Sequence, residues 1–221
     1  MIQRCLTLLL LLAAVSLFAG CAAAPQRPDY SAFKQSQPRS IVVLPPLNES
    51  PDVKATYGVL SQVTYPLAEA GYYVLPVALV AETFKQNGLD NPGDIHQVPA
   101  AKLSEIFGAD TALYIVVKDY GTRYKVLDSV VTVAASATLV DLKTGATLWT
   151  GSASASSQEG GNNGGGLLGQ LVAAALKQII NSVQKDAAYP IAGIASQRLL
   201  SAGGPASILY GPRSPKFGSD Y

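Results

Sequence analysis

Two short apolar runs, each followed by a segment with helical spacing, open the part of the sequence that is expected to fold. Residues 40–44 are apolar and β-branched and end at two prolines, the pattern of a central strand buried on both faces. Apolar residues then recur at helical spacing over residues 53–67, and Pro66 is expected to bend or end that helix. Residues 72–76 predict a second strand and residues 77–87 a second helix. The domain therefore begins with two β-α units.

Three longer strand-like runs follow, over residues 111–124, 126–141 and 146–156, after a short helix predicted for residues 100–107. A tight turn that includes Gly145 joins the last two runs. In the middle run one face is expected to carry Val131, Val133, Ala135, Ala137 and Leu139, and the other Thr132, Ala134, Ser136 and Thr138. The pattern predicts an antiparallel meander with side chains small enough on both faces for helices to lie close to the sheet.

A glycine-rich stretch, residues 157–166, precedes the most strongly apolar helix expected in the chain, over residues 167–183. Its apolar positions include Leu167, Leu171, Val172, Leu176, Ile179, Ile180 and Val183. Core packing is the preferred interpretation of this helix, a protein interface comes second, and membrane insertion comes third. A further helix is predicted from residue 185 to 200, and residues 203–221 are expected to be a flexible tail, ordered at most on a partner.

These elements predict the fold class α/β (α+β), with a mixed sheet that contains an antiparallel meander and is covered by helices. One domain is expected, over residues 39–202.

The first twenty residues have the pattern of a secretion signal. An apolar run over residues 6–18 follows one positive charge, and it is too short for a spanning helix, which needs about 20 apolar residues. Residues 17–21 resemble the bacterial lipoprotein box, which implies cleavage between Gly20 and Cys21 and acylation of Cys21 by chains such as palmitate. Phe18 departs from the usual leucine of that box and is expected to slow processing. The alternatives are a cleaved signal with an incidental cysteine and an uncleaved anchor.

Residues 22–38 are rich in proline and polar side chains and predict a flexible tether. At about 3.3 Å per residue, such a tether would hold the domain up to about 50 Å from the membrane. Ala22 is not the aspartate that retains lipoproteins of this kind at the inner membrane, so by that resemblance the protein is expected at the outer membrane, facing the periplasm.

Composition limits the partners. Lys and Arg number 16 and Asp and Glu 15, and cleavage would remove one arginine, so no net field favours nucleic acid. The two cysteines are Cys5, within the signal, and Cys21, so the mature chain is expected to have no disulfide.

Motifs that could carry chemistry are few. Residues 164–169 fit G-x-G-x-x-G, but they follow the meander rather than the first strand of a βαβ unit, so nucleotide binding is not expected. The single histidine, His96, is interpreted as a solvated loop residue rather than a catalytic one. Four aspartates, Asp110, Asp119, Asp128 and Asp141, are interpreted as structural, because none of them pairs into an acid/base set. Trp149 is interpreted as a core or rim anchor rather than a ligand platform.

Four sequence blocks together resemble a neisserial-type family of outer-membrane lipoproteins, first noted as surface antigens, whose function is unknown. They lie at residues 43–50, 65–74, 107–110 and 140–149, with Leu148-Trp149 closing the last. The resemblance covers about residues 39 to 200. It implies a fold like the N-terminal domain of TolB, shared with the lipoprotein that activates a penicillin-binding protein and with the curli secretion channel CsgG. It brings no catalytic residues and no cofactor.

The leading hypothesis is a non-enzymatic, lipid-anchored periplasmic module that docks on another envelope component and assists a secretion or cell-wall assembly complex. The alternative is a self-assembling ring or pore of the CsgG type, and a periplasmic enzyme comes third.

Overall fold

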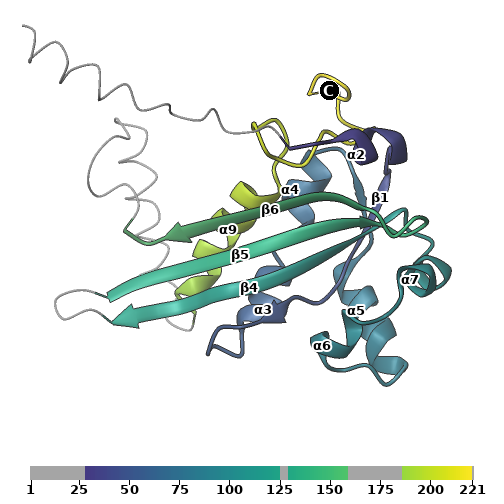
Figure 1. The fold of residues 1–221 in the computed structure, drawn as a ribbon. Helices are drawn as coiled ribbons and strands as arrows, with labels where there is room; N and C mark the ends of the chain where they lie inside the picture. Colours follow the sequence, from purple (N-terminus) through teal and green to yellow (C-terminus); the bar gives the residue numbers. More distant parts are fainter. Residues whose placement is uncertain (1–27, 125–128, 159–185, 221) are drawn as a thin grey trace, which may run out of the picture.

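The computed structural model describes residues 28–124, 129–158 and 186–220. In this part of the chain a mixed sheet has the strand order β3-β1-β4-β5-β6, with β2 pairing with β4 (Figure 1). The strands are β1 (Ser40–Val43), β2 (Leu47–Asn48), β3 (Tyr73–Val74), β4 (Thr111–Tyr124), β5 (Ser129–Asp141) and β6 (Thr147–Ser156). The helices are α2 (Ser31–Ser36), α3 (Ala55–Leu60), α4 (Thr64–Glu69), α5 (Val77–Gln86), α6 (Pro92–Ile95), α7 (Ala100–Phe107) and α9 (Ala188–Leu200). The predicted fold class is confirmed.

The sheet has a parallel half and an antiparallel half. β1 runs parallel to both β3 and β4, and β2 continues alongside β4 after Pro45 and Pro46 interrupt the ladder. β4, β5 and β6 form the predicted antiparallel meander, which Figure 1 shows extending well beyond the parallel strands. The parallel half therefore carries the crossovers, and the antiparallel half is a long ribbon.

Two hydrophobic clusters lie on opposite faces of the sheet. The larger one joins α3, α4 and α9 to residues of β5 that alternate along the strand, from Val131 to Leu139, as the sequence predicts. The smaller one joins α5, α6 and α7 to Val42 and Leu44 beside the parallel strands. The helices of the first face contact all three strands of the meander, whereas on the other face α7 packs on the start of β4. Helices close to both faces of the meander were expected, and the intervening residues of β5, from Thr132 to Thr138, are instead partly exposed.

The helix expected over residues 53–67 is two helices, α3 and α4. The break lies before Pro66, not at it, because Pro66 occupies the first turn of α4, where a missing N–H costs nothing. The helix expected over residues 100–107 is confirmed as α7, and it ends at Gly108 in the left-handed conformation.

Both ends of the described chain pack on the domain. Within the expected tether, α2 buries Phe33, which is only 2% exposed. Within the expected flexible tail, Ile208 and Leu209 are 0% and 3% exposed and belong to the larger cluster. The expectation of a flexible tail over residues 203–220 is therefore wrong, because this short apolar group fills a gap in the core that no local pattern reveals. The expected tether, residues 22–38, likewise extends too far, because α2 near its end packs on the domain.

Candidate functional site

A cleft opens at the carboxyl ends of β1 and β3. β1 leads, through β2, to α3 on one face of the sheet, whereas β3 leads to α5 on the other face. The chain thus leaves two neighbouring parallel strands toward opposite faces. Such a topological switch point leaves a crevice, and ligands of open α/β sheets bind at this place.

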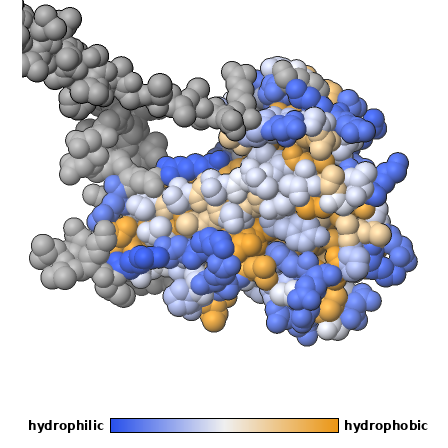
Figure 2. Space-filling model, viewed as in Figure 1, coloured by the Kyte–Doolittle hydropathy of each residue, from blue (hydrophilic) through white to orange (hydrophobic). Residues whose placement is uncertain are grey.

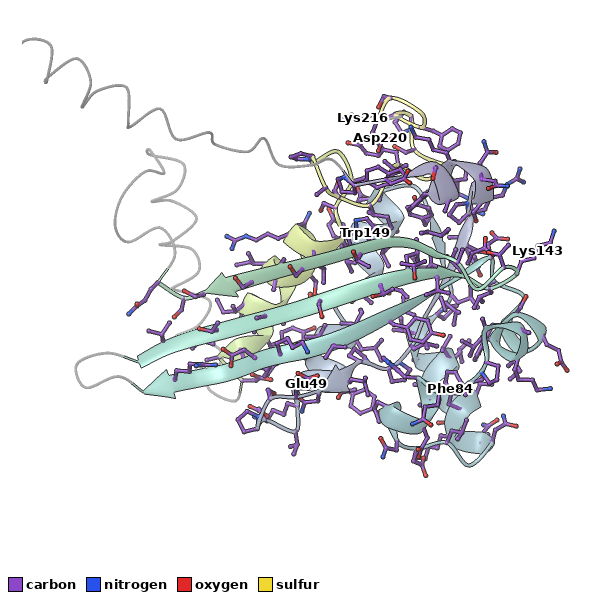
Figure 3. The ribbon with its side chains drawn as sticks, viewed as in Figure 1. Glu49, Phe84, Lys143, Trp149, Lys216 and Asp220 are labelled. Atoms are coloured by element: carbon purple, nitrogen blue, oxygen red, sulfur yellow. The ribbon has the colours of Figure 1, made fainter. Side chains whose placement is uncertain are left out.

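The cleft has a volume of about 420 Å³ and mostly apolar walls. It is lined by Pro45, by Tyr57 and Leu60 of α3 and Ser61 directly after it, by Val77, Ala78, Ala81, Glu82 and Lys85 of α5, and by Leu89, Asp90 and Ile95. Val80 and Phe84 turn the opposite side of α5 into the smaller cluster, and Figure 3 shows Phe84 among the helices below the strands. The remaining side of α5 faces the cleft with two alanines, whose small side chains keep it open.

His96 contacts Pro45, one of the residues that line the cleft. Its Nε2 lies 2.9 Å from the carbonyl oxygen of Pro45, and its ring packs edge-on against Tyr114 at a centroid distance of 5.2 Å. Burial is the largest influence on this imidazole and lowers its pKa, so at neutral pH the uncharged ring donates the Nε2 proton to the carbonyl. The interpretation of His96 as a solvated loop residue is wrong, because α6 folds within that loop and carries the ring under Pro45.

This placement predicts a pH dependence of stability. Because the folded-state pKa of His96 is lowered, the unfolded chain binds the proton more readily. The contribution of His96 is therefore complete above the unfolded pKa of about 6.5 and declines as the pH falls through the folded pKa. In His96→Gln the amide nitrogen can reach the same carbonyl and does not titrate. The urea midpoint of the natural chain should fall more steeply between pH 7 and 5 than that of H96Q, and equal slopes would contradict this assignment.

An exposed aromatic side chain lies at the cleft. Tyr57, which lines the cleft, is 65% exposed. Figure 2 shows apolar surface breaking the hydrophilic surface below the meander, in the region of α3 and α5. Tyrosines exposed beside a pocket are characteristic of protein-binding surfaces.

The polar groups at the cleft are either hydrogen-bonded within the domain or exposed at the rim. The Ser61 hydroxyl donates to the carbonyl of Gly58 at 3.0 Å, so it points back into its own helix. The charged groups at the rim, Glu82, Lys85 and Asp90, are all exposed. In the described ranges, no group of three or more His, Cys, Asp or Glu side chains is placed to hold a metal ion.

The aspartates that the structure describes have structural roles, as the sequence predicts. Asp110 accepts hydrogen bonds from the backbone of Arg39 and Ser40, and Asp141 accepts from two backbone N–H groups of the following turn. Asp119 forms an ion pair with Arg123 at 2.8 Å.

Trp149 is an anchor, as predicted. It is 4% exposed, and its indole nitrogen donates to the carbonyl of Ala206 at 3.0 Å (Figure 3).

Several predicted positions lie outside the described residues. They are the cleavage site at Gly20 and Cys21, Asp128, the glycine motif at 164–169, and the candidate interaction helix with Leu167, Leu171, Val172, Leu176, Ile179, Ile180 and Val183. Across the described ranges, none of the helices has the length and apolar character needed to cross a membrane. The cleft itself was missed from the sequence, because its walls come from four separate segments and no motif marks it.

The described fold is that of an α/β protein with a mixed sheet and a meander, and comparison with known proteins identifies a lipoprotein family. Residues 28–213 match the family model described as "Putative lipoprotein GNA1162-like". A lipoprotein of Neisseria meningitidis serogroup B, NMB1124/NMB1162, is 54% identical over 185 residues, which cover 84% of this chain and 85% of the relative. The chain therefore belongs to the GNA1162-like lipoprotein family, and the resemblance drawn from the sequence is confirmed.

One solved structure agrees with this assignment. The crystal structure of lipoprotein GNA1162 from Neisseria meningitidis is 57% identical and covers 65% of this chain and 99% of its own, with a TM-score of 0.53. The PelC dodecamer from Paraburkholderia phytofirmans is 15% identical and covers 83% of this chain and 96% of its own, with a TM-score of 0.45. The family match reaches residue 213, so it includes most of the packed C-terminal segment that the sequence resemblance left out. Membership of a lipoprotein family implies membrane anchoring.

Proposed function

We propose that this protein is a non-catalytic interaction module, anchored to the outer membrane through acylated Cys21, that docks on another protein of the cell envelope from the periplasmic side. The observation that carries the proposal is the apolar cleft flanked by the exposed Tyr57. A hollow of this kind accepts an apolar side chain of a partner, and the aromatic rim supplies contact area at low entropic cost.

The position of the anchor supports this role. α2 immediately precedes β1, so the chain enters the domain at the amino end of that strand, whereas the cleft lies at its carboxyl end. Pro28 lies seven positions after Cys21, and a fully extended chain over that interval spans about 23 Å. The domain would therefore stay close to the membrane, with the cleft directed away from it. A partner reaching across the periplasm would meet the cleft first.

Two further parts of the proposal rest on sequence. Ala22 after the lipidated cysteine supports the outer membrane as the location. The candidate helix from Leu167 to Val183 is proposed as an additional interaction element, because it combines a strong apolar stripe with a single charge.

Photo-cross-linking in living cells tests the cleft. A benzoylphenylalanine placed at Tyr57 should give an adduct with one other envelope protein, whereas the same group at Ile106 on α7, which is 44% exposed, should not. Equal labelling from both positions would reject the cleft as the docking site. An adduct that contains only this chain would favour the alternative of a self-assembling ring, which native mass spectrometry of the acylated protein would then reveal by its mass.

Filling the cleft should abolish docking without unfolding the domain. Ala81→Trp places an indole in the hollow, and since the site opens to solvent, the free energy of unfolding should change by less than about 0.5 kcal/mol. The adduct from position 57 should fall by at least about tenfold, as expected for the loss of a binding hot spot. Gln86→Trp, on an exposed position of α5 that does not line the cleft, is the matched control. An undiminished adduct in A81W would contradict the proposal.

A further inference from the structure

The strand β6 forms one edge of the described sheet, since it comes last in the strand order. The Ser157 N–H donates to the carbonyl of Val131 at 2.9 Å, so the backbone groups of Ser157 point toward β5. In an antiparallel pair the backbone groups of successive residues point alternately toward the neighbouring strand and away from it. Thr150 and Ser152 lie an odd number of positions from Ser157, so their N–H and C=O groups point to the open edge.

A contact of Arg198 confirms that these alternate residues of β6 turn their backbone groups to the open edge. Its Nη1 donates to the carbonyl of Ser154 at 2.8 Å. Ser154 lies two positions after Ser152, so the backbone groups of both point to the same side of β6. A charged side chain that caps an edge strand prevents further pairing there. In the part of the chain that the structure describes, no side chain caps the backbone of Thr150 or Ser152 in this way. The edge is closed at Ser154 and open just before it.

A groove of about 580 Å³ runs beside the open section. It is lined by Trp149, Thr150, Gly151 and Ser152 of β6, by Arg198 and Leu199 of α9, and by Gly204, Pro205, Ala206 and Ser207. Trp149 is fixed by its hydrogen bond to Ala206 and lies across Gly151, where a Cβ atom would come within 2.3 Å of the indole ring. The groove therefore combines a rigid apolar floor, two residues of unpaired backbone and a guanidinium at one end.

We propose that this groove binds an extended peptide segment of a partner protein, which adds a strand to β6 through the backbone of Thr150 and Ser152. Each of these residues offers one donor and one acceptor, and only an extended chain presents complementary groups at the same two-residue spacing. A helix satisfies its backbone internally and cannot pair in this way. Because side chains alternate along a strand, the segment would turn an apolar residue to the groove floor, and a carboxylate would suit the position near Arg198.

This surface is separate from the cleft, so the two proposals can fail independently. Ser152→Pro removes the N–H that faces the edge and leaves the ladder with β5 intact, which is where proline is tolerated in a sheet. Ser154→Pro also removes an N–H that faces the edge, but Ser154 lies outside the groove, and the change keeps the Ser154 carbonyl that Arg198 binds. It is the matched control. Cross-linking from Tyr57 should be unaffected by either change.

The probe is a phage-displayed pool of decapeptides with one fixed aspartate, selected on the acylated mature protein. The selected peptides should bind S152P at least about tenfold more weakly than S154P. On the unaltered protein, amide exchange at Thr150 and Ser152 should be fast alone and slow with the peptide, whereas Gly151 and Ala153, which face β5, should be slow in both. Because amide exchange is measured on the unaltered protein, it tests the proposal even if S152P unfolds.

Three results would overturn the proposal. The first is equal binding of the peptides to both proline variants. The second is slow exchange at Thr150 and Ser152 in the free protein at every concentration, because the edge would then already be covered. The third is protection that appears only as the protein concentration rises, because the occupant would then be a second copy of this chain.

Discussion

A chain that ends at Ser201 is expected to lose its stable fold, although residues 202–220, the described part of the removed segment, contain no helix or strand. Burying a side chain such as isoleucine or leucine stabilises a protein by about 1.5–3 kcal/mol, and truncation removes both Ile208 and Leu209 from the core. It also uncovers Trp149 and Tyr72, which are 4% and 3% exposed in the intact domain. The total is comparable with the 5–15 kcal/mol that separates a folded domain of this size from its unfolded state.

Graded substitutions at Ile208 separate this packing role from an unspecific effect of shortening. Ile208→Ala should lower the free energy of unfolding by about 2–5 kcal/mol, whereas Ile208→Val should lower it by about 0.5–1.5 kcal/mol. Urea denaturation followed by tryptophan fluorescence measures both, because Trp149 is the only tryptophan and contacts this segment directly. A truncated chain with an unchanged urea midpoint would show that the C-terminal segment is dispensable for the fold.

Gly58→Val is expected to destabilise the domain by at least about 3 kcal/mol. A Cβ atom at Gly58 would lie 2.4 Å from the hydroxyl oxygen of Tyr120 and 2.9 Å from the ring carbon that bears it. The ring cannot retreat easily, because its hydroxyl donates to Asp186 at 3.0 Å and its side chain is only 2% exposed. Alanine in a helix is favoured over glycine by about 1 kcal/mol, but overpacking a core costs about 1–3 kcal/mol, so even Gly58→Ala should destabilise.

A double-mutant cycle with Tyr120→Phe tests this explanation. Removing the hydroxyl removes the nearest clash, so the cost of Gly58→Ala should be smaller in the Y120F background than in the natural chain. The change also bears on the cleft, because Gly58 sets how closely α3 lies on β4 and Tyr57 is its neighbour in that helix. Cross-linking from Tyr57 should therefore weaken in G58A even where the domain stays folded. Increased stability of G58A would show that the contact is not tight.

The sequence was most informative where the structure is local. α7 ends at Gly108 as expected, because a glycine that can take the left-handed conformation stops a helix without help from the rest of the chain. The alternation along β5 was correct because one face of a strand must be apolar wherever it meets a core. Trp149 was correctly interpreted as an anchor, since a large aromatic in a strand is most often buried.

The errors share one cause, which is contact between segments far apart in the chain. The C-terminal segment looked flexible because glycine, proline and serine dominate it, and its order depends on Trp149 and on Tyr30, whose hydroxyl donates to the carbonyl of Ser207 at 2.6 Å. His96 looked solvated because nothing near it in sequence reveals the carbonyl of Pro45, 51 positions away. The cleft went unpredicted for the same reason.

The sequence by itself determined the class of this protein: a mixed α/β domain with a meander, and membership of a lipoprotein family that its own sequence blocks already indicated. Hydrophobic periodicity, the positions of glycine and proline, and residue type are local properties, and they were sufficient to predict this class. Only the tertiary structure decided which surfaces can bind. The cleft exists because β1 and β3 send the chain to opposite faces. In the described sheet β6 comes last in the strand order, and Arg198 meets its edge at Ser154 only because α9 packs beside it. Both depend on distances between residues that the chain brings together only when it folds.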